Sequence, residues 1–187
     1  MGDYWDQKDT GKKISVSDVK KYKKIGDGKD GRVYQLSFDR CVKIFYREDT
    51  HRKELEAIRM GQFSSIIPRL YGYGRNYIVM EYVDGLSLSD YLKKYKTLPE
   101  SLVESILYML DELEEVGFAR RDTEVRHILI NKRGELKVID HKRALTSHRE
   151  IPEKLFEGLK KRGYLKKFLQ QVKYIRPSLY NKWKDEY

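Results

Sequence analysis

Short alternations of apolar and polar residues along the chain predict a sheet built from antiparallel strands. Residues 32–38 place polar and apolar side chains at alternate positions, which is the period of a half-buried strand. Asp39-Arg40 is expected to form a tight turn into the next strand. The same signals predict strands at residues 32–38, 41–46, 71–74, 76–80, 128–130 and 136–139.

Apolar residues three or four positions apart predict helices. Leu55 and Ile58 have this spacing, and a proline such as Pro152 can open a helix. Gly158 and Gly163 interrupt the apolar spacing of the helix that follows Pro152. Helices are predicted over residues 51–60, from Ser87 or Ser89, from residue 153 to about residue 172, and after Pro177.

Two aspartates bracket the last predicted hairpin. Asp122 precedes its first strand, Asp140 follows its second strand, and residues 131–134 form the turn. Because an antiparallel hairpin returns the chain to its starting side, both carboxylates are expected at one edge of a small sheet. One can accept a proton from a hydroxyl, and the other can hold a divalent metal ion. The alternative is that both are strand-end aspartates, which favour turns.

Residues 25–34 contain the motif G-x-G-x-x-G, formed by Gly26, Gly28 and Gly31. Glycines let a backbone turn tightly and approach phosphates. A dinucleotide-binding fingerprint requires a helix directly after the glycines, whereas a strand follows here. The motif is therefore either a phosphate-covering loop on a hairpin or an ordinary glycine-rich turn.

Lys43 lies between two apolar residues of the strand predicted at 41–46. It can point to solvent, or it can bind nucleotide phosphates and pair with a glutamate of the next helix. Glu54 and Glu56 are about 200° apart around that helix, so only one of them can face Lys43. Glu54 is the preferred partner and Glu56 the second choice.

The order of these features resembles the eukaryotic-like protein kinase superfamily from about residue 22 to about residue 145. Residues 79–88, V-M-E-Y-V-D-G-L-S-L, are similar to the hinge of that family, and the 18 positions from Asp122 to Asp140 match its usual spacing. The resemblance implies an α+β, two-lobed fold. Its N-lobe is an antiparallel β-sheet with one main helix, and its C-lobe is reduced and mainly helical.

The resemblance also implies a single kinase-like domain over residues 1–187. Residues 1–20 would be a polar N-terminal extension, residues 21–83 the N-lobe, and residues 84–187 a minimal C-lobe with basic C-terminal helices. The polar composition of residues 1–20 predicts either loose attachment or an added edge or short helix formed by Ile14, Val16 and Val19. No A-P-E motif or activation segment is visible after Asp140. In this respect the chain is similar to RIO-type kinases, the small kinase that serves tRNA modification and small bacterial serine/threonine kinase-like proteins.

An ATP site in the N-lobe is implied by the same resemblance. Lys43 would bind the α- and β-phosphates, and Glu54 would orient Lys43. The glycines that cover the phosphates would be Gly26, Gly28 and Gly31. The residues that meet the adenine would be Val33, Met80, Glu81 and Val83, with Glu81 and Val83 using their backbone.

The two aspartates would complete the family's catalytic site. Asp122 would orient or deprotonate the acceptor hydroxyl, and Asp140 would bind Mg²⁺, or Mn²⁺, between the phosphates. His127 takes the place of the family's metal-binding asparagine. It is either a metal ligand or a structural residue, since imidazole is a poorer Mg²⁺ ligand than an oxygen.

Other positions also depart from the family pattern. Glu124 replaces the catalytic-loop lysine, and Lys142 replaces the glycine two positions after Asp140. Arg126 or Lys142 can supply the missing positive charge, or both can be solvated surface cations. These departures leave two hypotheses open beside each other, an active kinase and a pseudokinase.

Composition limits the class of protein further. The 187 residues include one cysteine, Cys41, which excludes an intrachain disulfide and favours a reducing, cytoplasmic location. No run of 18 apolar residues predicts a membrane span, and the first residues lack the apolar core of a signal peptide. The formal net charge is +10, and residues 153–187 hold ten Lys and Arg against four acids. This region can bind an acidic protein, RNA or an anionic membrane, or it is a solvated outer face.

The preferred hypothesis is an ATP-dependent serine/threonine protein kinase that transfers the γ-phosphate to a protein hydroxyl. The alternative is an ATP-binding pseudokinase or scaffold. A small-molecule kinase of the aminoglycoside or choline type is disfavoured, because such enzymes carry large helical insertions and this chain has no room for one.

Overall fold

The computed structural model describes residues 9–119, 123–146 and 151–186, and the chain forms two compact units. The sheet unit comprises Met1–Asp84 with Asp140–Leu145, and the helical unit comprises Gly85–Ile139 with Thr146–Tyr187. The predicted α+β class, with an antiparallel sheet and helices, is confirmed. The predicted division differs in one respect, because residues 140–145 return to the sheet unit.

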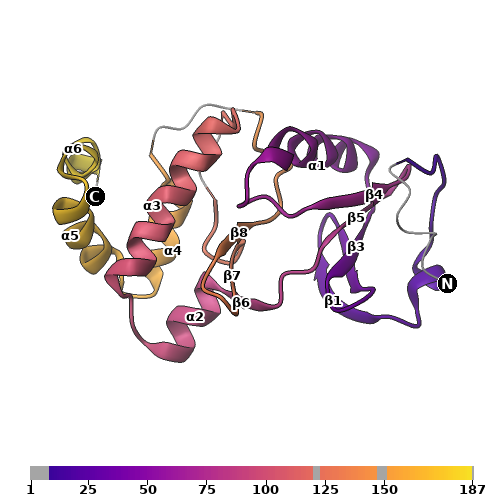
Figure 1. Ribbon diagram of the computed structural model, residues 1–187, viewed down its shortest axis with the longest axis horizontal. Coiled ribbons are helices and arrows are strands. Elements are labelled where there is room, and N and C mark those ends of the chain that lie inside the picture. The colour runs from indigo at the N-terminus through magenta and orange to yellow at the C-terminus, as the bar shows by residue number, and fades with distance from the viewer. Residues whose placement is uncertain (1–8, 120–122, 147–150, 187) are drawn as a thin grey trace. The chain divides into compact units, whose positions relative to one another are not determined.

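The sheet unit contains a five-stranded antiparallel sheet with the strand order β1-β2-β3-β5-β4 (Figure 1). The predicted strand at 32–38 ends earlier, because the N–H groups of Leu36 and Ser37 both donate to Arg40 O and form the turn there. The strands are β1 (Lys23–Gly28), β2 (Gly31–Gln35), β3 (Arg40–Phe45), β4 (Leu70–Tyr73) and β5 (Tyr77–Glu81).

The two faces of this sheet differ in chemistry, since side chains alternate along each strand. Val33 lies opposite Lys43, and Lys43 lies opposite Ile78, so these residues share one face. The opposite face is apolar and buried. Its cluster consists of Ile14, Val19, Tyr34, Val42, Ile44, Tyr77 and Val79.

The helix α1 (Glu48–Met60) begins three residues before the prediction. Glu48 and Asp49 lie in its first turn, where carboxylates stabilise the positive end of the helix dipole. The residues buried at helical spacing include His51, Glu54 and Ile58, whereas Glu56 is exposed. A 3₁₀ turn, η2 (Gly61–Phe63), follows the helix.

The N-terminal segment is attached to the sheet over its described part, so the alternative of a short helix, and not loose attachment, describes it. Thr10 N–H donates to Tyr73 O at 3.0 Å, and Asn76 Nδ2 donates to Ile14 O at 2.7 Å. Ile14 and Val19, the latter in the 3₁₀ helix η1 (Val16–Val19), are buried against the apolar face of the sheet. These hydrogen bonds and buried side chains together attach the segment.

The helical unit contains a three-stranded sheet of β6 (Gly85–Ser87), β7 (Ile128–Asn131) and β8 (Leu136–Val138). The helix α2 (Leu88–Tyr95) starts after Ser87, whose Oγ accepts a hydrogen bond from Asp90 N–H at 3.1 Å. Of the two serines that were predicted to start this helix, Ser87 is therefore the cap. The helix α3 (Glu100–Glu115), to which no prediction was assigned, packs against β8.

The single helix predicted over residues 153–172 is two helices, α4 (Glu153–Lys161) and α5 (Leu165–Ile175). Gly163 has φ +76° and ends the first of them, because only glycine adopts this conformation at little cost. The helix α6 (Pro177–Trp183) then begins at Pro177 as predicted, and the 3₁₀ turn η3 (Lys184–Glu186) follows it. Within the described residues, no helix has the length and apolar character that crossing a membrane requires.

Candidate functional site

Lys43 and Glu54 form a buried ion pair inside the sheet unit. Lys43 Nζ donates to both carboxylate oxygens of Glu54, at 2.8 and 2.7 Å. The side chains of Lys43 and Glu54 are 12% and 2% exposed. Burial raises the pKa of Glu54, and the charge of Lys43 opposes that rise. The sheet and α1 thus hold one ammonium group in a fixed position.

Asp140 brings a second carboxylate to Lys43. Its Oδ1 lies 3.7 Å from Lys43 Nζ, and its side chain is 18% exposed. Asp140 has φ +64°, a left-handed conformation that aspartate tolerates better than most residues. Lys43 therefore contacts both Glu54, its preferred predicted partner, and Asp140.

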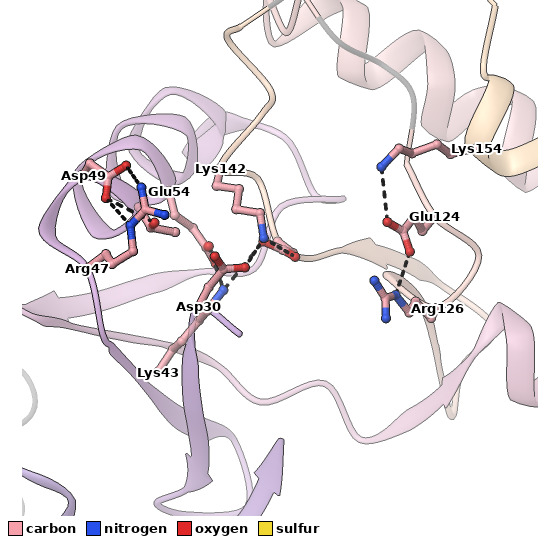
Figure 2. Close-up of polar contacts among 11 residues, drawn as sticks. Asp30, Lys43, Arg47, Asp49, Glu54, Glu124, Arg126, Lys142 and Lys154 are labelled. Atoms are coloured by element: carbon pink, nitrogen blue, oxygen red, sulfur yellow. Dashed lines mark hydrogen bonds and ion pairs between the residues drawn. The ribbon is translucent and has the colours of Figure 1, made fainter. Parts of the chain in front are cut away.

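Lys142 extends this group of charges to the glycine-rich turn. Its Nζ donates to Asp30 Oδ2, and the same Nζ lies 3.4 Å from Asp140 Oδ2 (Figure 2). Asp30 lies in the turn between β1 and β2, within the G-x-G-x-x-G motif. We call Asp30, Lys43, Glu54, Asp140 and Lys142 the charged cluster.

The glycines of the motif have different structural roles. A Cβ on Gly31 would lie 2.0 Å from Ile44 O, so glycine is required there for β2 to approach β3. A Cβ on Gly26 would lie 3.3 Å from Val33 Cβ, whereas Gly28 meets nothing closer than 4.0 Å. Sheet packing alone accounts for Gly31, and Gly28 is the position with free space around it.

The residues predicted to meet the adenine lie on and after β5. Met80 is buried opposite Cys41, and Val33 is half-buried on β2. Glu81 N–H donates to Arg69 O at 2.8 Å, so that donor is used within the protein. In the described part of the chain, the main chain of Val83 makes no hydrogen bond. Val83 thus has the more available backbone of the two predicted positions.

The predicted catalytic residue Asp122 lies outside the described residues. Glu124, Arg126 and Lys154 form a second polar group, in the helical unit. Glu124 accepts from Lys154 Nζ at 3.2 Å and lies 2.7 Å from Arg126 Nε (Figure 2). Burial raises the pKa of Glu124, but the hydrogen bonds from Lys154 and Arg126 outweigh it and lower that pKa. Arg126, one of the two candidate replacement cations, is therefore paired with Glu124.

His127 connects the ends of the β7–β8 hairpin through its main chain. Its N–H donates to Glu124 O at 2.8 Å, and its carbonyl accepts from Ile139 N–H at 3.0 Å. The residue before β7 thus bonds to the residue after β8, as the hairpin argument expected. The shared metal site of His127 and Asp140 stays a prediction, because the two residues belong to different units.

Asp140, in the contacts described here, is a poor ligand for a resident Mg²⁺ or Mn²⁺ ion. No group of three or more potential ligands gathers among the described residues. Each oxygen of Asp140 lies next to an ammonium group, Oδ1 near Lys43 and Oδ2 near Lys142. A divalent cation would have to share these oxygens with positive charges, so no chemical step is assigned to one.

Sequence reasoning missed Asp30 and Lys154. Asp30 carried a weak signal, since it is a carboxylate inside a motif expected to meet phosphates. Lys154 carried none, because it is one of many lysines in the basic C-terminal region.

The curated proteins to which this chain is similar carry the names of protein kinases. The chain is 32% identical over 148 residues to mitogen-activated protein kinase kinase 1 of Arabidopsis thaliana, covering 68% of this chain and 41% of that protein. It is 27% identical over 153 residues to mitogen-activated protein kinase kinase 2 of the same plant, covering 68% and 40%. YrzF of Bacillus subtilis (strain 168), whose name places it among serine/threonine-protein kinases, is 26% identical over 121 residues, covering 62% and 56%.

The chain spans about two fifths of the length of the first two relatives. No family model matches it.

Proposed function

Because this chain belongs to the protein-kinase-like superfamily, we propose that it is an ATP-dependent phosphotransferase acting on serine or threonine hydroxyls of a protein. The observation that carries this proposal is the buried pair of Lys43 and Glu54 with Asp140 beside it. Phosphoryl transfer depends mainly on positioning and on charge stabilisation, and a fixed ammonium group provides both.

Each part of the site has a proposed role. Lys43 binds the phosphates of ATP, and Glu54 prevents Lys43 from turning away. The turn of Gly28 covers the phosphates, and the backbone of Val83 hydrogen-bonds the adenine. Asp122 accepts the proton of the acceptor hydroxyl as its oxygen attacks the γ-phosphorus and ADP leaves.

The test is turnover of γ-labelled ATP by the full chain, with Mg²⁺, with Mn²⁺ and with EDTA. Asp122→Asn and Asp140→Asn are compared with the wild type, and Lys53→Met serves as a control on the exposed side of α1. Incorporation into the chain or a protein acceptor that both aspartate variants lose supports the proposal. We expect the Asp122→Asn loss to be on the order of 100-fold or more, since a general base contributes that much. We expect a similar loss for Asp140→Asn, because Asp140 lies beside the Lys43 ammonium that is proposed to bind the phosphates.

The second candidate function is an ATP-binding pseudokinase. The contact between Lys142 and Asp140 favours it, since a lysine occupies the place where the family positions a metal ion. Absence of incorporation under all three conditions, together with ATP binding that Lys43→Ala abolishes, would establish this alternative. A cytoplasmic location, and an acidic protein or RNA partner for residues 153–187, stay predictions.

A further inference from the structure

Lys142 places an ammonium group between two carboxylates of the sheet unit. Its Nζ donates to Asp30 Oδ2 and lies 3.4 Å from Asp140 Oδ2. Asp30 belongs to the turn between β1 and β2, and Asp140 is the predicted metal-binding residue. One cation thus joins the glycine-rich turn to the carboxylate that would otherwise hold a metal ion (Figure 2).

The three side chains are largely removed from water. Lys142, Asp30 and Asp140 are 17%, 18% and 18% exposed. Charges at such depth are screened weakly, so each ammonium–carboxylate contact is stronger than on the surface. The contacts of Lys142 Nζ with these two carboxylates favour the charged ammonium form of Lys142.

The charges of the cluster show what Lys142 changes. Three carboxylates (Asp30, Glu54 and Asp140) face two ammonium groups (Lys43 and Lys142), which leaves a net charge of −1. Without Lys142 the net charge would be −2, and Asp30 and Asp140 would both have lost the cation they share. Two adjacent carboxylates are the ligands that a hard divalent cation prefers.

We infer that the Lys142 ammonium is the cation of this site. It offsets one of the two negative charges of Asp30 and Asp140, excludes a divalent ion from between them, and allows the sheet unit to bind nucleotide phosphates without metal. Lys142 supplies this charge next to Lys43, so the phosphates meet two ammonium groups. The inference rests on the nucleotide binding proposed above, but not on phosphoryl transfer.

The first experiment uses the metal alone. Mn²⁺ binding to the full chain is measured by electron paramagnetic resonance for the wild type, Lys142→Met, Lys142→Met with Asp140→Asn, and the control Lys53→Met. Lys142→Met should bind Mn²⁺ about tenfold more tightly than the wild type, a difference of about 1.4 kcal/mol, because the ammonium group that competes with the metal ion is removed. The added Asp140→Asn should abolish that gain, and Lys53→Met should behave as the wild type.

The second experiment measures the binding of a fluorescent ATP analogue in EDTA and in excess Mg²⁺. Wild-type affinity should differ by less than about threefold between the two conditions, a difference of less than 1 kcal/mol. Lys142→Met should lose about tenfold in EDTA and recover most of that loss in Mg²⁺. Lys142→Arg, which keeps the charge, should lose less in EDTA than Lys142→Met.

Two results would overturn the inference. One is a wild-type chain that binds Mn²⁺ as tightly as Lys142→Met, and the other is wild-type nucleotide binding that requires Mg²⁺ as strongly as Lys142→Met does. If the wild type binds no nucleotide at all, the proposed function fails, and the Mn²⁺ result still decides the role of Lys142. If Lys142→Met does not fold, Asp30→Asn with Lys142→Met removes both partners and must show the same loss of nucleotide affinity in EDTA.

Discussion

The sheet unit buries the ion pair of Lys43 and Glu54, whereas the helical unit leaves its pair of Lys154 and Glu124 partly exposed. The exposed fractions are 12% and 2% in the first pair and 29% and 33% in the second. In the helical unit, buried aromatic rings pack against one another. The ring centroids of Phe156 and Trp183 are 5.1 Å apart.

The two units therefore differ in the kind of interaction that they bury. A buried ion pair contributes little net stability, because desolvation of the charges offsets their attraction. It does hold its members in one arrangement, which a site for phosphates requires. The aromatic contacts of the helical unit add stability without a desolvation cost. We therefore interpret the sheet unit as the part shaped for ligand binding and the helical unit as the part shaped for packing.

The largest effect is expected from Lys43→Met. The variant leaves the Glu54 carboxylate buried without its cation, which should cost about 3–5 kcal/mol of unfolding free energy in urea titrations. Lys154→Met is the matched variant in the exposed pair and should cost about 0.2–1 kcal/mol. Equal losses in the two variants would remove the contrast between the units.

The loss of unfolding free energy in Lys43→Met should also depend on pH. Burial raises the pKa of Glu54 above its usual value of 4.5, and the variant lacks the Lys43 charge that opposes that rise. A raised pKa in the folded state means that stability is present below pH 4.5 and is lost as pH rises through the folded pKa. The variant should therefore approach wild-type stability in acid, and Lys43→Met with Glu54→Gln should recover stability at neutral pH.

An intermediate effect is expected from Gly158→Ala in α4. Alanine normally stabilises a helix by about 1 kcal/mol relative to glycine. Here the new Cβ would lie 2.7 Å from both methyl groups of Val125, so the variant should instead lose about 1–3 kcal/mol in urea titrations. Adding Val125→Ala should reverse part of that loss. A Gly158→Ala chain that is more stable than the wild type would show that α4 does not pack closely on this loop.

A smaller, pH-dependent effect is expected from His51. Burial lowers its pKa below 6.5, although the hydrogen bond between His51 Nε2 and Tyr77 O, at 3.2 Å, opposes this. A lowered pKa in the folded state gives stability that is present above pH 6.5 and is lost as pH falls through the folded pKa. The unfolding free energy should be measured from about pH 7.5 to about pH 5, a range that brackets the usual histidine pKa. Over this range it should decrease less steeply with falling pH in His51→Gln than in the wild type. Parallel curves would assign the acid sensitivity to other groups.

Much of the fold was predictable from local spacing. The turn at Asp39-Arg40 and the strand-like residues 41–46 identified β3, and the apolar spacing of Leu55 and Ile58 identified α1. The sequence showed an interruption at Gly163, but two separate helices were not predicted, because the backbone conformation there depends on how α5 packs. The attachment of residues 9–19 stayed open, because it rests on hydrogen bonds to residues more than 60 positions away.

The sequence by itself determined the order of strands, helices and charged residues, because a strand repeats every two residues and a helix about every 3.6. It therefore sufficed for the resemblance to kinases and for the choice of Lys43, Glu54 and Asp140. Only the tertiary structure showed which residues Lys142 contacts. Its partner Asp30 is 112 positions away, and no local pattern distinguishes a lysine that enters a charged site from one that faces solvent. Such contacts form only when the sheet brings distant turns together.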